Sequence, residues 1–271
     1  MYLGGLYTAE KYKKSLDLVL IPNNIHNESL QTMNVKHNLK IASKLESLAI
    51  KILRVMSKVN QKTKRNIRKL GFYFTSEVGF PDDILAGYSP KFVSAYFQSH
   101  HIHRMALQKN SVFDLLGYSP SEWARELTEN EIGSNDIAIH VRLGDYINEK
   151  HNIGLVGIGY YEESILRARE LGGTGKIRVI TNDVEVCQKF LSSITFDLEF
   201  VEQPKNVRDF DSLYIMTQHS YLIISNSSFS LLAGLEANPC VVIRPSPWFK
   251  NLKEPNELSP PEWIEIPSAW R

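Results

Sequence analysis

The alternation of apolar runs with helical periodicity is most regular after residue 133. Short apolar runs there predict buried strands, and the segments between them place apolar residues at helical spacing. The predicted strands are residues 136–141, 176–181, 198–201, 221–225 and 240–245, and the predicted helices are residues 160–172, 184–193, 209–219 and 228–237. Strands that alternate with helices in this way predict an α/β fold with a parallel, doubly wound sheet.

The first half of the chain follows a less regular pattern. A helix ending near residue 14 precedes an apolar strand at 15–21, and residues 89–108 predict an extended piece that runs into a helix. Residues 119–136 are polar and charged, which is typical of a domain boundary. Because 271 residues suffice for about two domains, we expect one domain over residues 1–132 and a second over 133–271.

Charge changes the interpretation of one amphipathic segment. Residues 36–69 hold eleven Lys and Arg side chains and a single acid, Glu46, although the whole chain has a formal net charge of only +1. Apolar residues recur there at steps of three and four beside a basic stripe, which predicts a basic amphipathic helix. It could pack on its own domain with a solvated face. It could also dock on an anionic membrane or a lipid-linked substrate; nucleic acid is disfavoured because few aromatic residues interleave the charges.

The first candidate site is the end of the strand in DIAIHVRLGDYIN, residues 136–148. Ligands bind beyond the carboxyl ends of the strands in parallel sheets, and Arg142, Gly144 and Asp145 follow this strand directly. The Arg142 guanidinium suits phosphate oxygens, and Gly144 permits close backbone approach. The alternative is an Arg–Asp pair that closes a loop, with His140 as a core residue.

The second candidate site lies where the strand in YLIISNSSFSLLAGLEA gives way to a helix. Asn226, Ser227 and Ser228 would lie at the helix start, where unpaired N–H groups and the helix dipole bind anions. Simple capping of the helix is the alternative interpretation.

Other residue types restrict the chemistry. Cys187 and Cys240 lie in apolar settings and are expected to be reduced thiols. Residues 81–83 predict a turn, and the histidines of residues 100–103 predict part of a helix rather than a metal site. No apolar stretch approaches the about 20 residues of a membrane span, so we expect a cytoplasmic protein.

Six stretches, in order along the chain, resemble the bacterial α-1,2-fucosyltransferases of glycosyltransferase family 11. AYFQS (95–99) is similar to the Gly-Tyr-Phe-Gln-Ser segment of that family, and HVRLGDY (140–146) to its His-x-Arg-Arg-Gly-Asp-Tyr motif. GYYEESI (159–165) is similar to its paired-tyrosine helix start. The stretches VITNDVEVCQKFL (179–191), DFDSLYIMTQHSYLIISNSSFS (209–230) and VVIRPSPWF (241–249) complete the resemblance.

The resemblance implies a GT-B-like fold of two Rossmann-like domains. Residues 1–132 would form the acceptor-side domain and residues 133–271 the domain that binds the GDP-sugar. The chain begins with MYLGGLYTAEKYKK, where the family has an apolar strand and a Gly-Gly-x-Gly-Asn-Gln turn. The N-terminal domain is therefore expected to be incomplete or divergent.

The resemblance also assigns roles to the donor-binding residues. Arg142 matches the arginine of the donor diphosphate, His140 the histidine near guanine, and Asp183 a position near guanine or ribose. Gly144, Asn226, Ser227, Ser228 and Phe229 complete the expected donor site. The resemblance does not identify the general base: Asp145 could fill that role or could orient Arg142, and an acidic residue of residues 1–132 is equally possible. No metal and no cofactor beyond GDP-fucose is expected.

The implied reaction is an inverting transfer of L-fucose from GDP-fucose to a hydroxyl, O2 of galactose, of a surface-glycan or O-antigen acceptor. The alternative is a truncated or inactive relative that binds GDP-sugar or glycan without turnover. Expected partners are a nucleotide sugar and a glycan or lipid-linked oligosaccharide, with contact at the inner membrane through residues 36–69 and none with nucleic acid.

Overall fold

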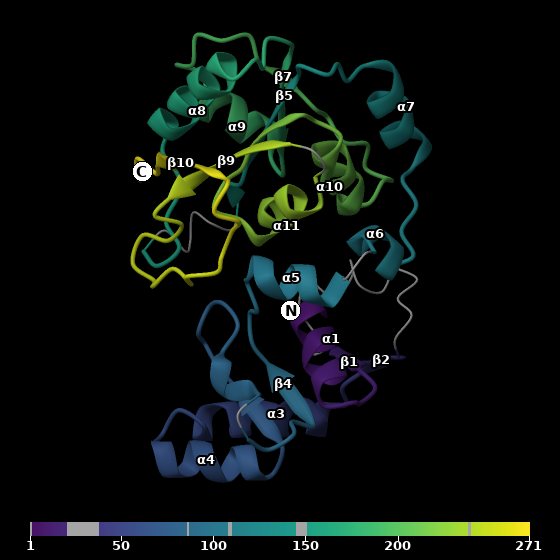
Figure 1. Cartoon of the computed structure of the whole chain (residues 1–271), viewed down its shortest axis with the longest axis vertical. Coiled ribbons are helices and arrows are strands. Elements are labelled where there is room, and N and C mark those ends of the chain that lie inside the picture. The colour runs from purple at the N-terminus through teal and green to yellow at the C-terminus, as the bar shows by residue number, and fades with distance from the viewer. Residues whose placement is uncertain (1, 21–37, 86, 108–109, 145–150, 238–239) are drawn as a thin grey trace. The chain divides into compact units, whose positions relative to one another are not determined.

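The computed structural model describes residues 2–20, 38–85, 87–107, 110–144, 151–237 and 240–271 (Figure 1). The chain divides into two compact units, one of residues 1–119 with 255–258 and one of residues 120–254 with 259–271. Helix α7 (Glu122–Asn130) thus belongs to the second unit, whereas the sequence division at residue 132 assigned it to the first. The reason is local: the Ser121 N–H donates to Asp211 Oδ1 at 2.8 Å, which ties the start of α7 to the second unit.

The second unit contains a six-stranded parallel sheet in the order β10-β9-β8-β5-β6-β7. Its strands are β5 (Ile137–Val141), β6 (Ile177–Thr181), β7 (Glu199–Phe200), β8 (Tyr221–Ile223), β9 (Val241–Ser246) and β10 (Ile264–Pro267). The chain moves outward from β5 to β7, returns to β8 and then moves outward on the other side. The strand order therefore reverses between β5 and β8, which is where sheets of this kind bind ligands.

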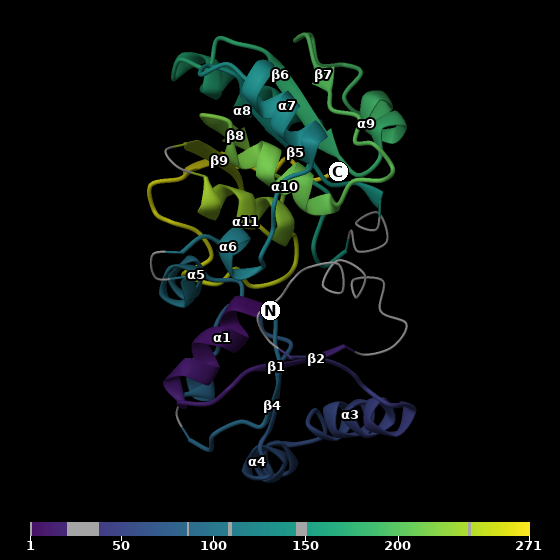
Figure 2. The same ribbon diagram turned by 90° about the vertical axis from the view of Figure 1, so that its right-hand side faces the viewer.

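Four helices connect these strands: α8 (Ile158–Glu170), α9 (Val184–Phe190), α10 (Asp209–Thr217) and α11 (Ser228–Glu236). Right-handed crossovers place α8 and α9 on one face of the sheet and α10 and α11 on the other (Figure 1 and Figure 2). β5 is buried along its whole length, as expected for a central parallel strand. The α/β class and the parallel sheet expected from the sequence are confirmed.

The first unit holds two separate two-stranded parallel sheets. β1 (Asp17–Leu20) pairs with β2 (Asn38–Ile41), and β3 (Phe72–Phe74) pairs with β4 (Phe92–Ser94). Its helices are α1 (Tyr2–Lys11), α3 (Lys44–Met56), α4 (Gln61–Lys69), α5 (His100–Leu107) and α6 (Val112–Leu115), with a 3-10 turn at Asp82–Ile84. In the described residues this unit lacks one continuous sheet, which agrees with the expected incomplete or divergent Rossmann-like domain.

The predicted single basic helix is two helices. α3 ends at Met56, and α4 begins after Asn60, whose side-chain oxygen accepts a hydrogen bond from the Thr63 N–H at 2.8 Å. The basic positions keep the same spacing across the turn, so their periodicity did not reveal the break. Asparagine favours such helix starts because its side chain pairs with the otherwise unsatisfied N–H groups.

The two cysteines are unpaired and the histidines of residues 100–103 lie in a helix, as expected from the sequence. Cys187 and Cys240 are free, and burial raises the pKa of each thiol to about 12. The histidines of residues 100–103 belong to α5, and no cluster of three His, Cys, Asp or Glu side chains suited to a metal occurs in the described ranges. Each helix within the described ranges is too short or too polar to cross a membrane.

Candidate functional site

The imidazole of His140 joins the carboxyl ends of the two strands at the switch point. His140 is the fourth residue of β5 and is only 3% exposed, and its Nδ1 lies 2.9 Å from Ser225 Oγ, just beyond β8. Burial, reinforced by the positive charge of Arg142, lowers the pKa of His140 to about 3. The ring is therefore neutral at physiological pH, and the fixed positive charge of this edge comes from Arg142.

Arg142 and Leu143 leave the end of β5 in different directions. The Leu143 side chain is 1% exposed and packs in the hydrophobic core of the sheet, whereas Arg142 is half-buried. Alternation of side chains along an extended segment accounts for this difference. Arg142 therefore does not enter the core with Leu143, and its positive charge acts on His140 at the end of β5.

The loop after Arg142 is held by a residue that sequence reasoning passed over. The Leu143 N–H donates to Asn182 Oδ1 at 3.4 Å, and Asn182 follows β6 on the neighbouring strand. Gly144 has a φ of +30°, and a Cβ at this position would lie 2.5 Å from Asn182 Nδ2. The signal for Asn182 was its place beside Asp183 at the end of a predicted strand. Asp145 lies outside the described residues.

Asp183 has a structural role at the start of α9. Its Oδ1 accepts a hydrogen bond from the Val186 N–H at 3.1 Å, which is the geometry of a helix N-cap. The side chain is partly exposed at the carboxyl end of β6. Asn182 and Asp183 thus lie just beyond β6, the strand next to β5, on the same edge of the sheet as Arg142.

The start of α11 forms the other side of the candidate site. Ser227 is the N-cap and accepts a hydrogen bond from the Phe229 N–H at 3.3 Å, while Ser228 is exposed. The centroid of the Phe229 ring lies 5.8 Å from that of His140, so the start of α11 lies next to the end of β5. The free N–H groups and the dipole of a helix start favour an anion there.

Asn226 is directed into the protein. It is 2% exposed, and its Nδ2 donates to the carbonyl oxygens of Ile153 and Gly154 at 3.1 and 3.0 Å. The amide therefore secures the segment before α8 against the start of α11. The structure brings together His140, Arg142, Gly144, Ser227 and Phe229 around the β5–α11 edge, with Asp183 one strand away.

Tyr160 supports the same edge from inside. Its hydroxyl lies 2.6 Å from the carbonyl oxygen of Ile224, just after β8, and 3.1 Å from that of Ile243, within β9. The side chain is fully buried, and burial raises its pKa well above the usual value for tyrosine. Tyr160 therefore acts as a neutral hydrogen-bond donor that fixes the backbone beneath Ser225.

Comparison with known proteins agrees with this arrangement. The family model described as "Glycosyl transferase family 11" matches residues 27–267. The chain belongs to glycosyl transferase family 11. The match to the family model includes all six strands of the large sheet and the β5–α11 edge.

One curated protein is similar in sequence to this family 11 chain. It is the alpha-1,2-colitosyltransferase of Escherichia coli, which is 31% identical over 153 residues. The alignment covers 53% of this chain and 51% of that protein. The chain thus matches about half the length of this relative.

Three solved structures resemble the family 11 chain at low sequence identity. A family 9 glycosyl transferase from Veillonella parvula is 13% identical with a TM-score of 0.45, over 98% of this chain and 82% of that one. The E. coli heptosyltransferase WaaC with ADP is 11% identical with a TM-score of 0.44, over 99% and 91%. POFUT1 with GDP is 11% identical with a TM-score of 0.43, over 87% and 89%.

Proposed function

We propose that this family 11 glycosyltransferase moves L-fucose from GDP-fucose to a sugar hydroxyl, O2 of a galactose, with inversion at the anomeric carbon. The proposal rests on family membership together with one observation, the position of Arg142 directly after the central strand and beside a neutral histidine. A guanidinium at this edge offers a planar set of donors to diphosphate oxygens. The acceptor would belong to a surface glycan such as an O-antigen.

In the proposed mechanism, the enzyme accelerates the reaction mainly by stabilising the leaving group, GDP. As the bond between C1 of fucose and the diphosphate breaks, negative charge grows on GDP. Arg142 and the start of α11 would stabilise that charge more strongly in the transition state than in the bound donor, which lowers the barrier. Arg142 would thereby supply the charge that a metal ion supplies in other glycosyltransferases, and no cofactor besides the donor is part of the proposal.

The remaining site residues would bind the nucleoside. His140, neutral and held by Ser225, would lie on the guanine side, and Asp183 would lie near guanine or ribose. Gly144 would leave room for the donor beside Asn182. The proton of the acceptor hydroxyl would go to a carboxylate, either Asp145 or an acidic residue of the first unit.

The sugar carried by GDP is the finer point of the proposal. The similar E. coli protein is named for the transfer of colitose, so GDP-colitose is the second donor to test beside GDP-fucose. A second function is binding of GDP-sugar or glycan without turnover. The observation that favours it is that the described residues of the first unit, where the acceptor would bind, form only two small, separate sheets.

Two measurements test the proposal together. Calorimetric titration with GDP, with ADP as the matched control, asks whether the site binds the guanine nucleotide. Assays with GDP-fucose and GDP-colitose on galactosyl acceptors then ask for transfer. Transfer from GDP-fucose supports the proposal, and transfer from GDP-colitose alone changes the donor sugar. Tight GDP binding without transfer favours the binding function, and no GDP binding contradicts both.

A lipid-linked acceptor would bring the reaction to a membrane surface. We propose that the enzyme meets the cytoplasmic face of the inner membrane, and that residues 36–69 make the contact because they carry the excess of basic charge. The polar, anionic headgroup region of a membrane attracts such a segment.

A further inference from the structure

Helix α3 turns its apolar side away from the unit that carries it. The side chains of Leu45, Ile52 and Val55 are 80%, 50% and 67% exposed, and those of Leu48, Met56 and Val59 are exposed as well. The opposite side of the helix, with Ser47 buried and Ile50 and Leu53 partly buried, packs on the protein. Among the described residues, α3 thus packs on its own unit through its less apolar side and leaves its apolar side exposed.

The exposed apolar side is one continuous stripe. Residues 45, 48, 52, 55, 56 and 59 recur at steps that keep them on one side of the helix and the following turn. We call these six residues the α3 stripe. Soluble proteins rarely leave a contiguous apolar surface of this kind uncovered, and such a surface marks an interaction site.

Basic side chains border the α3 stripe. Lys44, Lys51 and Lys58 recur every seven residues along one edge, next to the exposed apolar positions. The single acid of this segment is Glu46. Its Oε1 pairs with Lys40 Nζ at 2.5 Å, and its Oε2 accepts a hydrogen bond from the Ser43 N–H at 2.8 Å. The surface around the stripe is thus positively charged.

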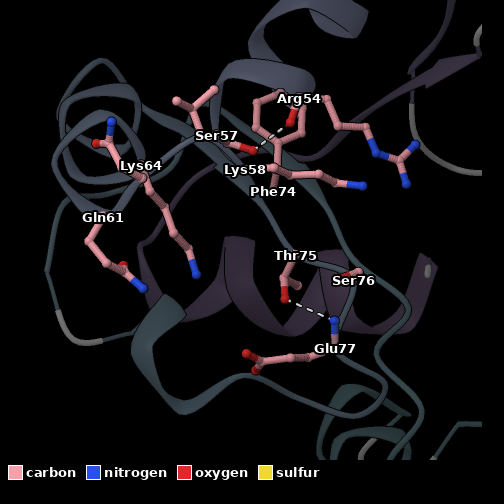
Figure 3. A pocket seen from close by; sticks show the side chains of 11 residues that line it. Arg54, Ser57, Lys58, Gln61, Lys64, Phe74, Thr75, Ser76 and Glu77 are labelled. Carbon is pink, nitrogen blue, oxygen red and sulfur yellow. Dashed lines mark hydrogen bonds between the residues drawn. The ribbon is translucent and has the colours of Figure 1, made fainter. Parts of the chain in front are cut away.

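A pocket of about 450 Å³ opens where α3 turns into α4 (Figure 3). Its basic wall comes from Arg54, Lys58 and Lys64, and its opposite wall comes from the segment after β3, with Thr75 and Glu77. Figure 3 shows the Lys58 and Lys64 side chains reaching toward the space above that segment. We call this cavity the α3–α4 pocket. Its charged lining has three cations and one acid, which suits a phosphate group better than a neutral ligand.

We infer that the α3 stripe and the α3–α4 pocket together form a docking surface for a bilayer that contains anionic phospholipid. The stripe would enter the boundary between headgroups and acyl chains, and the pocket would hold a lipid phosphate. An amphipathic helix with an apolar stripe bordered by lysines binds a membrane in this way. A free anion would explain the pocket but not the stripe, and a purely apolar protein partner would explain the stripe but not the charge.

The inference deepens the proposed membrane contact but does not depend on the donor sugar. It assigns the contact to particular side chains, whose exposure means that polar substitution should leave the fold intact. Transfer to a soluble acceptor should not change when the stripe is altered. Failure of membrane docking is therefore distinguishable from failure of the proposed transferase activity.

Sedimentation with vesicles of phosphatidylcholine, with and without phosphatidylglycerol, tests the inference on the full chain. The wild-type protein should bind the anionic vesicles and leave the neutral ones. Leu48→Gln/Ile52→Gln should weaken that binding by about tenfold or more, because burial of two large apolar side chains in the interface is lost. The matched control is Leu166→Gln/Leu252→Gln, which alters exposed leucines of the second unit and should bind as the wild type does.

A second pair of variants tests the pocket. Lys58→Gln/Lys64→Gln removes two charges that line it, and Lys62→Gln/Lys69→Gln removes two charges of α4 that do not. In both pairs, the weaker electrostatic attraction to the membrane should lower the affinity for anionic vesicles by about fivefold for each charge removed. The pocket pair should lose more affinity than the control pair, because it also loses the contact with the lipid phosphate. Equal losses would overturn the assignment of a lipid phosphate to the pocket.

The other outcomes decide between sources of the anion and kinds of partner. Titration with inorganic phosphate, without vesicles, tests whether the protein binds a free anion. If phosphate binds the isolated chain, and the stripe variant still binds anionic vesicles as tightly as the wild type, docking through the stripe is overturned. Equal binding to neutral and anionic vesicles, or none to either, overturns it as well.

Discussion

His140 Nδ1 lies 2.9 Å from Ser225 Oγ, and this contact links the carboxyl ends of β5 and β8. Because burial and the nearby Arg142 charge lower the pKa of His140 to about 3, the folded protein binds no proton on this ring at pH 5. The unfolded chain does bind one below its ordinary pKa of about 6.5. Stability contributed by the neutral ring is complete above about pH 6.5 and is lost progressively as the pH falls toward 3.

We therefore expect the free energy of unfolding to fall by about 1.4 kcal/mol per pH unit from His140 alone below pH 6. His140→Gln should remove this part of the slope. Urea unfolding of both proteins at pH 7 and pH 5 measures it. A wild-type and a variant protein with parallel pH profiles would show that His140 does not resist protonation.

Asp136 and Arg178 form a buried ion pair at the amino ends of the strands, away from the candidate site. Arg178 Nη1 donates to Asp136 Oδ2, and Arg178 is 0% exposed. Asp136→Asn would leave the guanidinium without its buried charge partner and with only the half-exposed Glu199, which costs about 3–5 kcal/mol. Glu199→Gln is the control, since Glu199 is 40% exposed and its pair with Arg178 should contribute less than about 1 kcal/mol. Denaturant titration should separate the two variants, and equal losses would contradict this account.

Substitution by alanine should change the stability of the protein in opposite directions at Gly157 and at Gly159, although the two glycines lie close together in the chain. A Cβ on Gly157 would lie 1.6 Å from the carbonyl oxygen of Ala269, so Gly157→Ala must displace the segment that ends at Arg271. We expect a loss of about 2 kcal/mol or more. A Cβ on Gly159, inside α8, meets ordinary contact at 3.6 Å, and Gly159→Ala should stabilise the helix by up to about 1 kcal/mol. Thermal unfolding measures both, and a stable Gly157→Ala protein would contradict the packing described.

Asn182 should act as a positioning residue for the loop of Arg142. Its side chain is exposed, so Asn182→Ala should leave the unfolding temperature within about 2 °C of the wild type. Loss of the hydrogen bond to the Leu143 N–H should loosen the loop and weaken GDP binding by about threefold to tenfold. Asn182→Asp keeps an acceptor oxygen and tests the bond separately from the added charge. GDP binding unchanged in Asn182→Ala would show that the loop needs no support from β6.

The sequence predicted the elements whose pattern is local. β5, β6 and β8 are short apolar runs in a regular alternation, and the sheet follows from them. β10 was missed because Ile264–Pro267 is short and ends in proline. The break between α3 and α4 was missed because the basic residues keep the same spacing through both helices.

The candidate site was predictable in part for the same reason. Arg142 follows a recognisable strand, and Ser227 begins a recognisable helix, so both could be placed at the same edge. The pairing of Asn182 with the Leu143 backbone joins residues on two strands, and only the register of β5 and β6 brings them together. Nor did the periodicity of α3 show which side of the helix faces the protein.

The role of Arg142 is the central claim, and calorimetric titration of GDP into Arg142→Ala tests it most directly. Removal of a guanidinium that contacts diphosphate should weaken GDP binding by about 30-fold or more, with an unchanged unfolding temperature. Arg142→Lys should recover part of the affinity, because a lysine keeps the charge but not the paired donors. The control Arg167→Ala removes an exposed arginine of α8, paired with Glu170, and should bind GDP as the wild type does. GDP affinity in Arg142→Ala equal to that of the wild type would contradict the account.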